Sequence, residues 1–558
     1  MGSPLRIGCV LSAIVCTFFG SALSTATAAD LPPQTRSGSL ATSTDLASWI
    51  DGELAVHFER SGAAQPRLVD DATFLRRVYL DLLGTIPAVS EVRDFLDDQT
   101  DNKRARLVER VLEDPRAAAH LARTWRRMLL PDAPPQGAMN GSLEAWLQEQ
   151  FAQDVPYDKV VRDLVTAGGA EQAIEEDADD DDADDGDEDE DEDDEAPAAS
   201  PAVEYLRGTG GDPASVAGSV SRVFLGVRMH CAQCHDHPFA DWTQRDFWGL
   251  AAFFAGARYN RPTLPNQDGA DQPITDEPVS TISPPDIGQT FQAGFLWDGG
   301  DIPAEVPEGE LPRRVFADWL TSADNPHFAA TAVNRTWQQL CGHGLTDSVD
   351  DLDLAGAAER AILLDQLARH FAAADFDLKW LIGGICQSRA YQFAADEPVA
   401  AAGLVGMRPL KVLSPEQVFD ALEVALALPI SRIDEGPRYN GQRDQMISRL
   451  GEATSQSPEE FRGGIPQMLM LMNGTLTADA TSLETSRTLR AVVEAPFLDE
   501  DEKIETLFLA ALTRPPEPAE ARQLKEHLED SARRGQEGRA YAEIMWALIN
   551  SPEFMLIR

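Results

Sequence analysis

Five side chains that bind metals or react as nucleophiles lie within eight consecutive residues of this chain. Cys231, Cys234 and His235 form the pattern C-x-x-C-H, and His230 and His237 flank it. Two thiols at this spacing can each add to one vinyl group of a porphyrin, and the adjacent imidazole then becomes an axial ligand of the iron. The pattern therefore predicts one covalent c-type haem, with Cys231 and Cys234 as the attachment residues and His235 on the iron.

The two flanking histidines leave a second chemistry open. Cys231 and Cys234, together with His235, His230 or His237, would supply up to four ligands for tetrahedral zinc. Haem attachment gives His230 and His237 no role, which strengthens the zinc interpretation. A disulfide between the two cysteines is the third interpretation, whereas thioredoxin-like redox chemistry requires a βαβ context that this helical segment lacks. Haem is the leading prediction and zinc the first alternative.

A haem iron has a second axial position, and the sequence selects no ligand for it. His237 is too close to His235 along the chain to reach the opposite face of a porphyrin. The remaining candidates are His327, His343, Met407, Met468, Met470 and Met472. The methionines at 468 and 472 share one helix face, which is also the pattern of an ordinary core helix.

Two predicted helices position the C-x-x-C-H pattern. Apolar residues at 216, 220, 223, 224 and 227 repeat with helical spacing and lead into Cys231. Pro238 disfavours helix at the residue before it. Thr243 and Asp246 then form a capping box that begins a second helix. The reactive side chains are expected between the two.

The predicted fold class is mainly α, with two helical domains. Residues 74–83 show one apolar helix face and are followed by Gly84, a typical helix end. The first domain spans residues 46–256 and the second spans residues 311–558. Residues 257–310 are rich in Pro, Gly, Asp and Thr, and we expect an irregular linker there with possible short strands.

The N-terminus has the pattern of a signal peptide. Arg6, an apolar stretch over residues 7–23 and the small residues Ala26 and Ala28 provide its three regions. Residues 1–28 are predicted to be removed on export, and residues 29–45 to form a flexible lead-in. A retained anchor is the alternative, because the apolar stretch is near the lower length limit for a membrane span.

Export predicts a periplasmic or cell-surface protein. No later stretch is long and apolar enough to cross a bilayer, so no stable membrane insertion is expected after signal cleavage.

The net charge of −46 excludes nucleic acid and anionic membrane surfaces as partners. Nineteen acidic residues and no basic residue lie between Glu171 and Glu195, and the rest of the chain still carries −27. Like charges repel and little apolar surface is available there, so residues 171–199 are predicted to be a disordered insertion. The run lacks the glycine and the ligand spacing of a calcium loop.

The other polar and sulfur-containing candidates have structural interpretations. Cys341 and Cys386 lie in apolar helical contexts and are expected to be buried. Arg335 and Asp350 could line a polar pocket, but pairing that holds helices together is favoured. No G-x-S-x-G, H-E-x-x-H or phosphate-binding glycine loop is present, so no catalytic residue is predicted.

Longer blocks of the sequence resemble two families. The segment RRVYLDLLGTIP, within residues 71–95, and the segment HCAQCHDHPF, within residues 224–254, resemble the planctomycete cytochrome-type DUF1549 domain. Residues 313–320, 333–349 and 376–392 resemble the DUF1553 domain that usually accompanies it. The chain departs from the families' pattern at the acidic insertion and at Cys341. The resemblance implies an exported, largely helical, two-domain protein and implies no reaction.

Haem attachment predicts electron transfer with a periplasmic or cell-surface redox protein as partner. The alternatives are a zinc-dependent extracellular enzyme and a non-catalytic cell-surface protein in which the Cys/His cluster holds a helix end.

Overall fold

The computed structural model describes residues 40–131, 138–168, 200–238, 240–258, 274–285, 287–297, 303–346, 348–352, 359–395, 408–427, 447 and 482–558. The predicted signal peptide, most of the lead-in and the acidic insertion lie outside these ranges. So do Met407, Met468, Met470 and Met472, four of the candidates for a second axial ligand.

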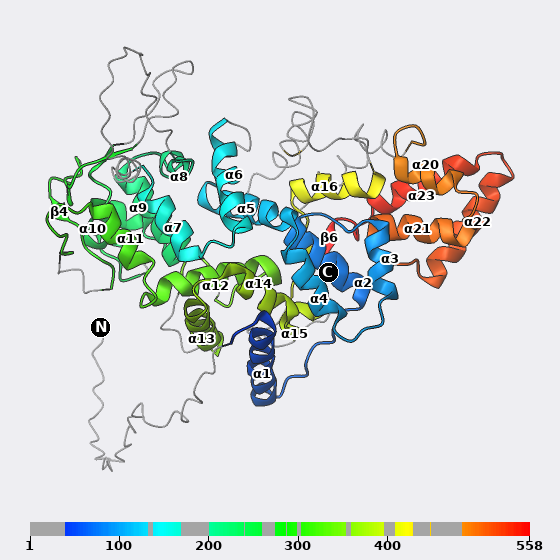
Figure 1. The fold of residues 1–558 in the computed structure, drawn as a ribbon, viewed down its shortest axis with the longest axis horizontal. Helices are drawn as coiled ribbons and strands as arrows, with labels where there is room; N and C mark the ends of the chain where they lie inside the picture. The colour runs from blue at the N-terminus through cyan, green and yellow to red at the C-terminus, as the bar shows by residue number, and fades with distance from the viewer. Residues whose placement is uncertain are drawn as a thin grey trace, which may run out of the picture. The chain divides into compact units, whose positions relative to one another are not determined.

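Helices make up most of the described chain, which confirms the mainly α fold class (Figure 1). The first half holds α1 (Ser43–Ser61), α2 (Asp71–Val78), the π-helix η1 (Tyr79–Leu83), α3 (Val89–Asp97), α4 (Lys103–Leu112), α5 (Pro115–Leu129), α6 (Ala138–Ala152), α7 (Tyr157–Thr166), α8 (Val203–Gly208), α9 (Pro213–Leu225), the 3₁₀ helix η3 (His230–Gln233) and α10 (Gln244–Ala252). α1 begins inside the predicted lead-in, because Thr42 and Asp45 form a capping box.

Helices also dominate the second half. It holds α11 (Pro312–Leu320), α12 (Pro326–Cys341), α13 (Glu359–Ala373), α14 (Leu378–Gln387), α15 (Arg389–Gln392), α16 (Pro415–Leu426), α20 (Arg487–Glu494), α21 (Glu500–Leu512), α22 (Pro518–Ala532) and α23 (Glu537–Ile549). None of the helices in the described part of the chain is both long and apolar enough to span a bilayer.

Among the described residues, strands are confined to three antiparallel ribbons of two residues a strand. β1 (Ala257–Arg258) pairs with β2 (Thr275–Asp276), and β3 (Thr281–Ile282) pairs with β4 (Phe291–Gln292). All four lie in the predicted irregular linker, which confirms its short strands. β5 (Lys411–Val412) pairs with β6 (Leu556–Ile557) and so joins the start of α16 to the C-terminus.

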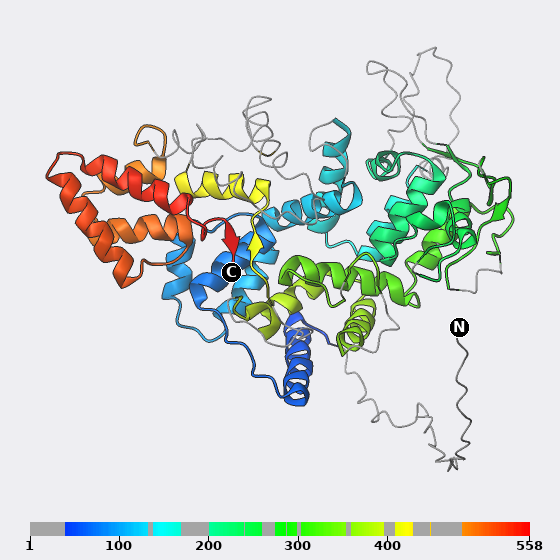
Figure 2. The same cartoon turned by 180° about the vertical axis from the view of Figure 1, so that it is seen from behind.

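Side chains from both predicted domains share the same cores. The larger cluster includes Ile50 of α1 and Leu381 of α14, two helices that pack along each other (Figures 1 and 2). The smaller cluster joins Leu80 of η1 to residues of α16, α21 and α23, such as Phe508. Residues 40–558 accordingly form one compact unit by their contacts. The predicted boundary at 257–310 therefore does not separate two independent cores.

The RRVYLD segment is buried and bonds to the second half of the chain. Arg76 donates to the carbonyl oxygens of Ala511 and Phe554, each at 2.9 Å. Arg77 donates to the carbonyl oxygen of Phe393 at 3.1 Å. The two arginines of this segment thus connect distant parts of the chain through hydrogen bonds to backbone carbonyl oxygens.

Candidate functional site

The C-x-x-C-H residues lie on an exposed turn between α9 and α10. The apolar stripe predicts a helix that leads into the motif. α9 instead ends at Leu225, and the next residue, Gly226, takes a left-handed conformation with φ 65°. Val227 is buried although it is no longer helical, so the stripe outlasts the helix. A short 3₁₀ turn, η3, then carries the first cysteine.

The backbone of this turn is held by α10. The indole nitrogen of Trp248 donates to the carbonyl oxygen of Gln233 at 3.0 Å, and the side-chain amide of Gln244 donates to the carbonyl oxygen of Cys234 at 3.0 Å. Asp236 accepts from the backbone N–H of Gln244 at 2.9 Å. These bonds fix the main chain while leaving the side chains of the motif out of the packing.

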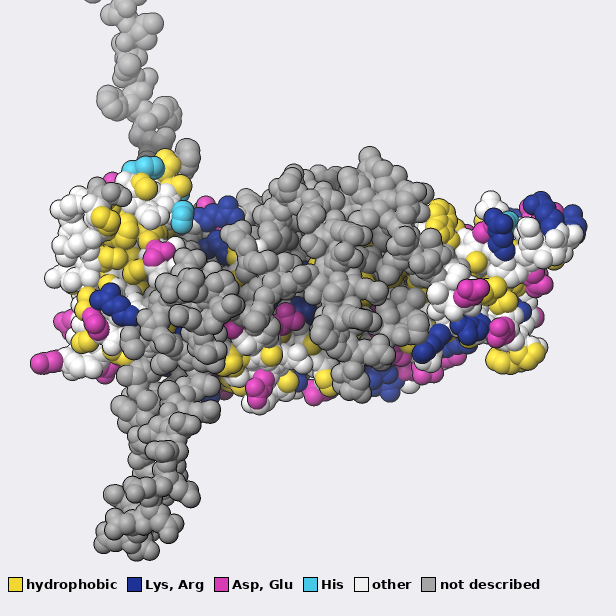
Figure 3. All heavy atoms as spheres, turned by 90° about the horizontal axis from the view of Figure 1, so that it is seen from above, with side chains coloured by type: hydrophobic (Ala, Val, Ile, Leu, Met, Phe, Trp, Pro, Cys, Tyr) yellow, Lys and Arg dark blue, Asp and Glu magenta, His cyan; other side chains and the backbone are white. Residues whose placement is uncertain are grey.

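The reactive side chains point outward. Cys231 and Cys234 are both exposed and are not bonded to each other. His230 and His235 are exposed as well, and His237 is half-buried. On the face drawn in Figure 3, histidine side chains lie beside hydrophobic ones at the side of the molecule where α9, α10 and α11 lie.

The orientation of His235 is set by the backbone. Its Nδ1 lies 2.8 Å from the carbonyl oxygen of Asp236. Because a carbonyl oxygen can only accept, Nδ1 is the donor in this hydrogen bond, which leaves Nε2 as the nitrogen outside it. Histidines that bind metals commonly hold their second nitrogen in this way.

Tetrahedral zinc requires four ligands that converge on one point. Within the described ranges, no group of three or more His, Cys, Asp or Glu side chains is arranged to hold a metal ion. His230, Cys231, Cys234, His235 and His237 are all described, so they lie close in the sequence without forming a tetrahedral ligand set.

Two candidates for a second axial ligand, His327 and His343, are described. A series of aromatic contacts links His327 to the motif. Trp242, whose carbonyl oxygen accepts from the N–H of His237, makes an edge contact with Trp297 at 5.7 Å between ring centroids. Trp297 stacks on His327 at 3.7 Å. His343 follows the other end of α12, about 24 Å along the axis by helical rise, and its Nδ1 lies 3.0 Å from the carbonyl oxygen of Gly344.

An arginine-rich ion cluster lies directly before the motif. Asp350 is buried and pairs with Arg335 and with Arg228, the latter at 2.6 Å, and Arg222 lies at 3.9 Å. Burial raises the pKa of the Asp350 carboxyl, but the three arginines outweigh burial and hold this pKa below its ordinary value. The Arg335–Asp350 pairing confirms the structural interpretation of these residues. Cys341 and Cys386 are buried, as predicted.

Two family models match the chain. One, PSCyt2, described as a protein of unknown function (DUF1549), covers residues 49–259, and the other, PSD1, described as a protein of unknown function (DUF1553), covers residues 312–462. The chain is a DUF1549–DUF1553 protein. No curated protein and no solved structure matches it.

In this DUF1549–DUF1553 protein the C-x-x-C-H turn belongs to the DUF1549 segment. Sequence reasoning identified the turn but not the hydrogen bonds by which Gln244 and Trp248 hold it. Their only signal was their place at the start of the capped helix after the motif, because hydrogen bonds to backbone carbonyls leave no pattern in side-chain types.

Proposed function

We propose that this protein carries one c-type haem on Cys231 and Cys234, with His235 as an axial ligand, and serves electron transfer. The observation that carries the proposal is the state of the turn: two exposed, unbonded thiols on a backbone that α10 holds in place. In the attachment step each S–H adds across one vinyl double bond. A carbon–sulfur bond forms, the proton goes to the other vinyl carbon, and no oxidant is consumed.

The geometry of His235 supports the same proposal. Its Nδ1–H is taken by the carbonyl oxygen of Asp236, so Nε2 is the nitrogen that faces a metal. A haem iron held there supplies reversible one-electron transfer. The turn itself orients the imidazole and presents the thiols.

We favour haem attachment over zinc because haem attachment places fewer geometric requirements on the turn. A tetrahedral zinc site needs four ligands that converge on one point, whereas thioether attachment needs two accessible thiols and one adjacent imidazole. The proposal includes export by means of residues 1–28 and a periplasmic or cell-surface redox protein as the partner.

The test is an intact mass and a visible spectrum of the full chain, exported in a host that attaches haem. We expect a covalent mass gain of one haem and reduced-state absorption bands. The double variant Cys231→Ala/Cys234→Ala should lose both. His235→Ala should keep the added mass and change the spectrum, because attachment and iron ligation use different atoms.

His230→Ala and His237→Ala are matched controls within the same turn. Both should keep the added mass and the bands, since neither residue has a role in the proposal. A colourless protein of unmodified mass would refute the proposal. Stoichiometric zinc that is lost in either control variant would establish the alternative in its place.

A further inference from the structure

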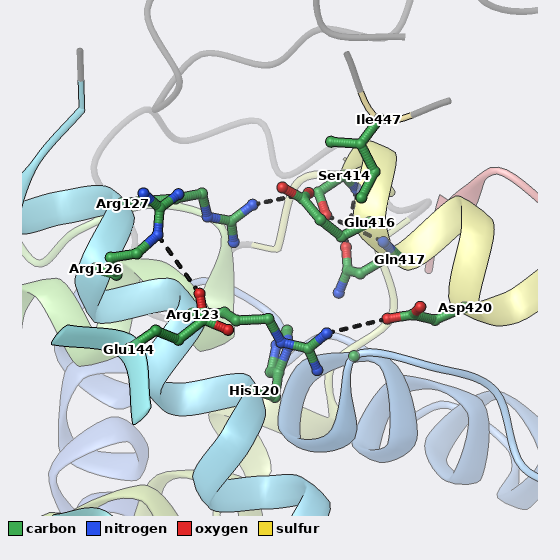
Figure 4. Close-up of a pocket in the computed structure, with 11 residues that line it drawn as sticks. His120, Arg123, Arg126, Arg127, Glu144, Ser414, Glu416, Gln417, Asp420 and Ile447 are labelled. Carbon is green, nitrogen blue, oxygen red and sulfur yellow. Dashed lines mark hydrogen bonds and ion pairs between the residues drawn. The ribbon is translucent and has the colours of Figure 1, made fainter. Parts of the chain in front are cut away.

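A cavity of about 60 Å³ lies where α5, α6 and α16 meet (Figure 4). α5 and α6 belong to the DUF1549 match and α16 to the DUF1553 match, so the cavity is complete only when both segments are joined. It is remote in sequence from the C-x-x-C-H turn, and none of its lining residues belongs to that turn.

Two of the three arginines in the cavity have carboxylate partners on α16. Arg123 pairs with Asp420, and Arg127 pairs with Glu416, each at 3.2 Å. Figure 4 shows both pairs as links from α5 across the cavity to α16. These contacts satisfy the two carboxylates and hold the walls of the cavity together.

Arg126 is different, because part of its guanidinium has no acceptor. Its side chain is buried, with the residue only 7% exposed, and the nearest carboxylate oxygen, on Glu144, lies 3.6 Å from Nε. Nη1 is buried and has no hydrogen-bond partner among the described residues. Burial lowers the pKa of Arg126, and Glu144 does not compensate fully. A buried, charged donor without an acceptor is destabilising.

His120 and the N-terminus of α16 also line the cavity. Burial, reinforced by Arg123 and Arg127, lowers the pKa of His120 to about 3, and the opposing effects of Asp81 and Glu416 are smaller. The cavity also faces the N-terminus of α16, which Ser414 caps, and the helix dipole there favours an anion.

We propose that this cavity binds a small oxyanion, a carboxylate, sulfate or phosphate group, whose oxygen accepts from Nη1 of Arg126. The cavity volume of about 60 Å³ is several times the roughly 10–15 Å³ that holds one water molecule on the same measure, so a small oxyanion fits. The site admits a single anionic group, either a free ion or the charged end of a larger ligand.

The experiment titrates the full chain with acetate, sulfate and phosphate in turn by calorimetry, with chloride added to keep the ionic strength constant. At least one of the three should bind. Arg126→Gln should weaken that binding by about tenfold or more, because it removes a charge-assisted hydrogen bond. Arg162→Gln is the matched control: it removes an exposed arginine of an ion pair elsewhere, with Asp318, and should leave binding unchanged.

Glu144→Gln gives the second, opposite readout. It removes the carboxylate that competes for Arg126 and should tighten binding severalfold, so the proposal stays testable if Arg126→Gln fails to fold. Which anion binds best separates a carboxylate site from a sulfate or phosphate site. The proposal is overturned if none of the three anions binds beyond chloride, if Arg126→Gln binds as the wild type does, or if Glu144→Gln binds more weakly.

Discussion

His120, which is buried, and His327, which is half-buried, tie stability to pH. Burial lowers the pKa of His327 to about 4, and burial, reinforced by neighbouring arginines, lowers that of His120 to about 3. In the unfolded chain both pKa values return to about 6.5. Below that pH the unfolded state binds more protons than the folded state, so the free energy of unfolding falls as the pH drops from 6.5 towards 4.

The free energy of unfolding in urea should therefore be lower at pH 5 than at pH 7. His120 alone should account for about 2 kcal/mol of the difference, since each pH unit within the window contributes 1.36 kcal/mol for one proton. His120→Gln should reduce this pH dependence, and His120→Gln/His327→Gln should reduce it further. An unchanged slope in the double variant would show that neither imidazole is neutral in the folded protein.

At the same scale, the sequence locates the reactive residues of the turn but not the buried side chains around them. Cys231, Cys234 and His235 could be found because the C-x-x-C-H pattern places them close together along the chain. Arg126 could not be found, because an arginine in an amphipathic helix has the pattern of a solvated residue. It is buried in the folded chain, and that burial is a tertiary property.

At the scale of elements, Gly226 decides where α9 ends and where the reactive turn begins. Its φ of 65° costs a non-glycine residue about 1 to 2 kcal/mol. A Cβ at this position would lie 2.6 Å from a methyl carbon of Leu352, so that side chain would have to shift. The N–H of Leu352 donates to the carbonyl oxygen of Gly226 at 2.8 Å, which ties the end of α9 to the segment that contains Asp350.

Gly226→Ala should destabilise the protein by about 2 kcal/mol or more in urea denaturation. Gly62→Ala is the matched control, because Gly62 ends α1 with the same φ of 65° and has nothing within 4 Å of the added methyl group. The control should show the backbone cost alone. Equal losses in the two variants would mean that the contact with Leu352 carries no strain.

Periodicity and caps predicted most of the helices near the site, and the errors have a common physical origin. The capping box at Thr243 and Asp246 is present as predicted, because a cap is a local interaction. The extension of α9 into the motif was wrong, because Val227 is buried by tertiary packing after the helix has ended. The spacing of hydrophobic residues indicates which residues are buried, and here the buried residues continue beyond the last residue of the helix.

For the whole molecule, Asp81 shows how the two family segments are coupled. It lies on η1 in the DUF1549 segment and is buried. It accepts from Arg408 at 2.9 Å, from the Tyr391 hydroxyl at 2.8 Å and from Lys411, all in the DUF1553 segment. Burial raises the pKa of the Asp81 carboxyl, but Lys411 and Arg408 outweigh it and keep the group ionised.

Asp81→Asn removes the negative charge that pairs with the buried Arg408 and the half-buried Lys411, which should cost about 3 to 5 kcal/mol. Because the cores contain side chains from both segments, this loss of stability should lower the free energy of unfolding of both segments together. Hydrogen exchange across a urea series should give one unfolding midpoint for protected amides in residues 49–259 and in residues 312–462. Asp81→Asn should lower that shared midpoint equally in both ranges, whereas Arg162→Gln, at an exposed pair, should barely move it. Two separate midpoints, or a shift confined to one range, would mean that the family segments fold as independent domains despite their shared cores.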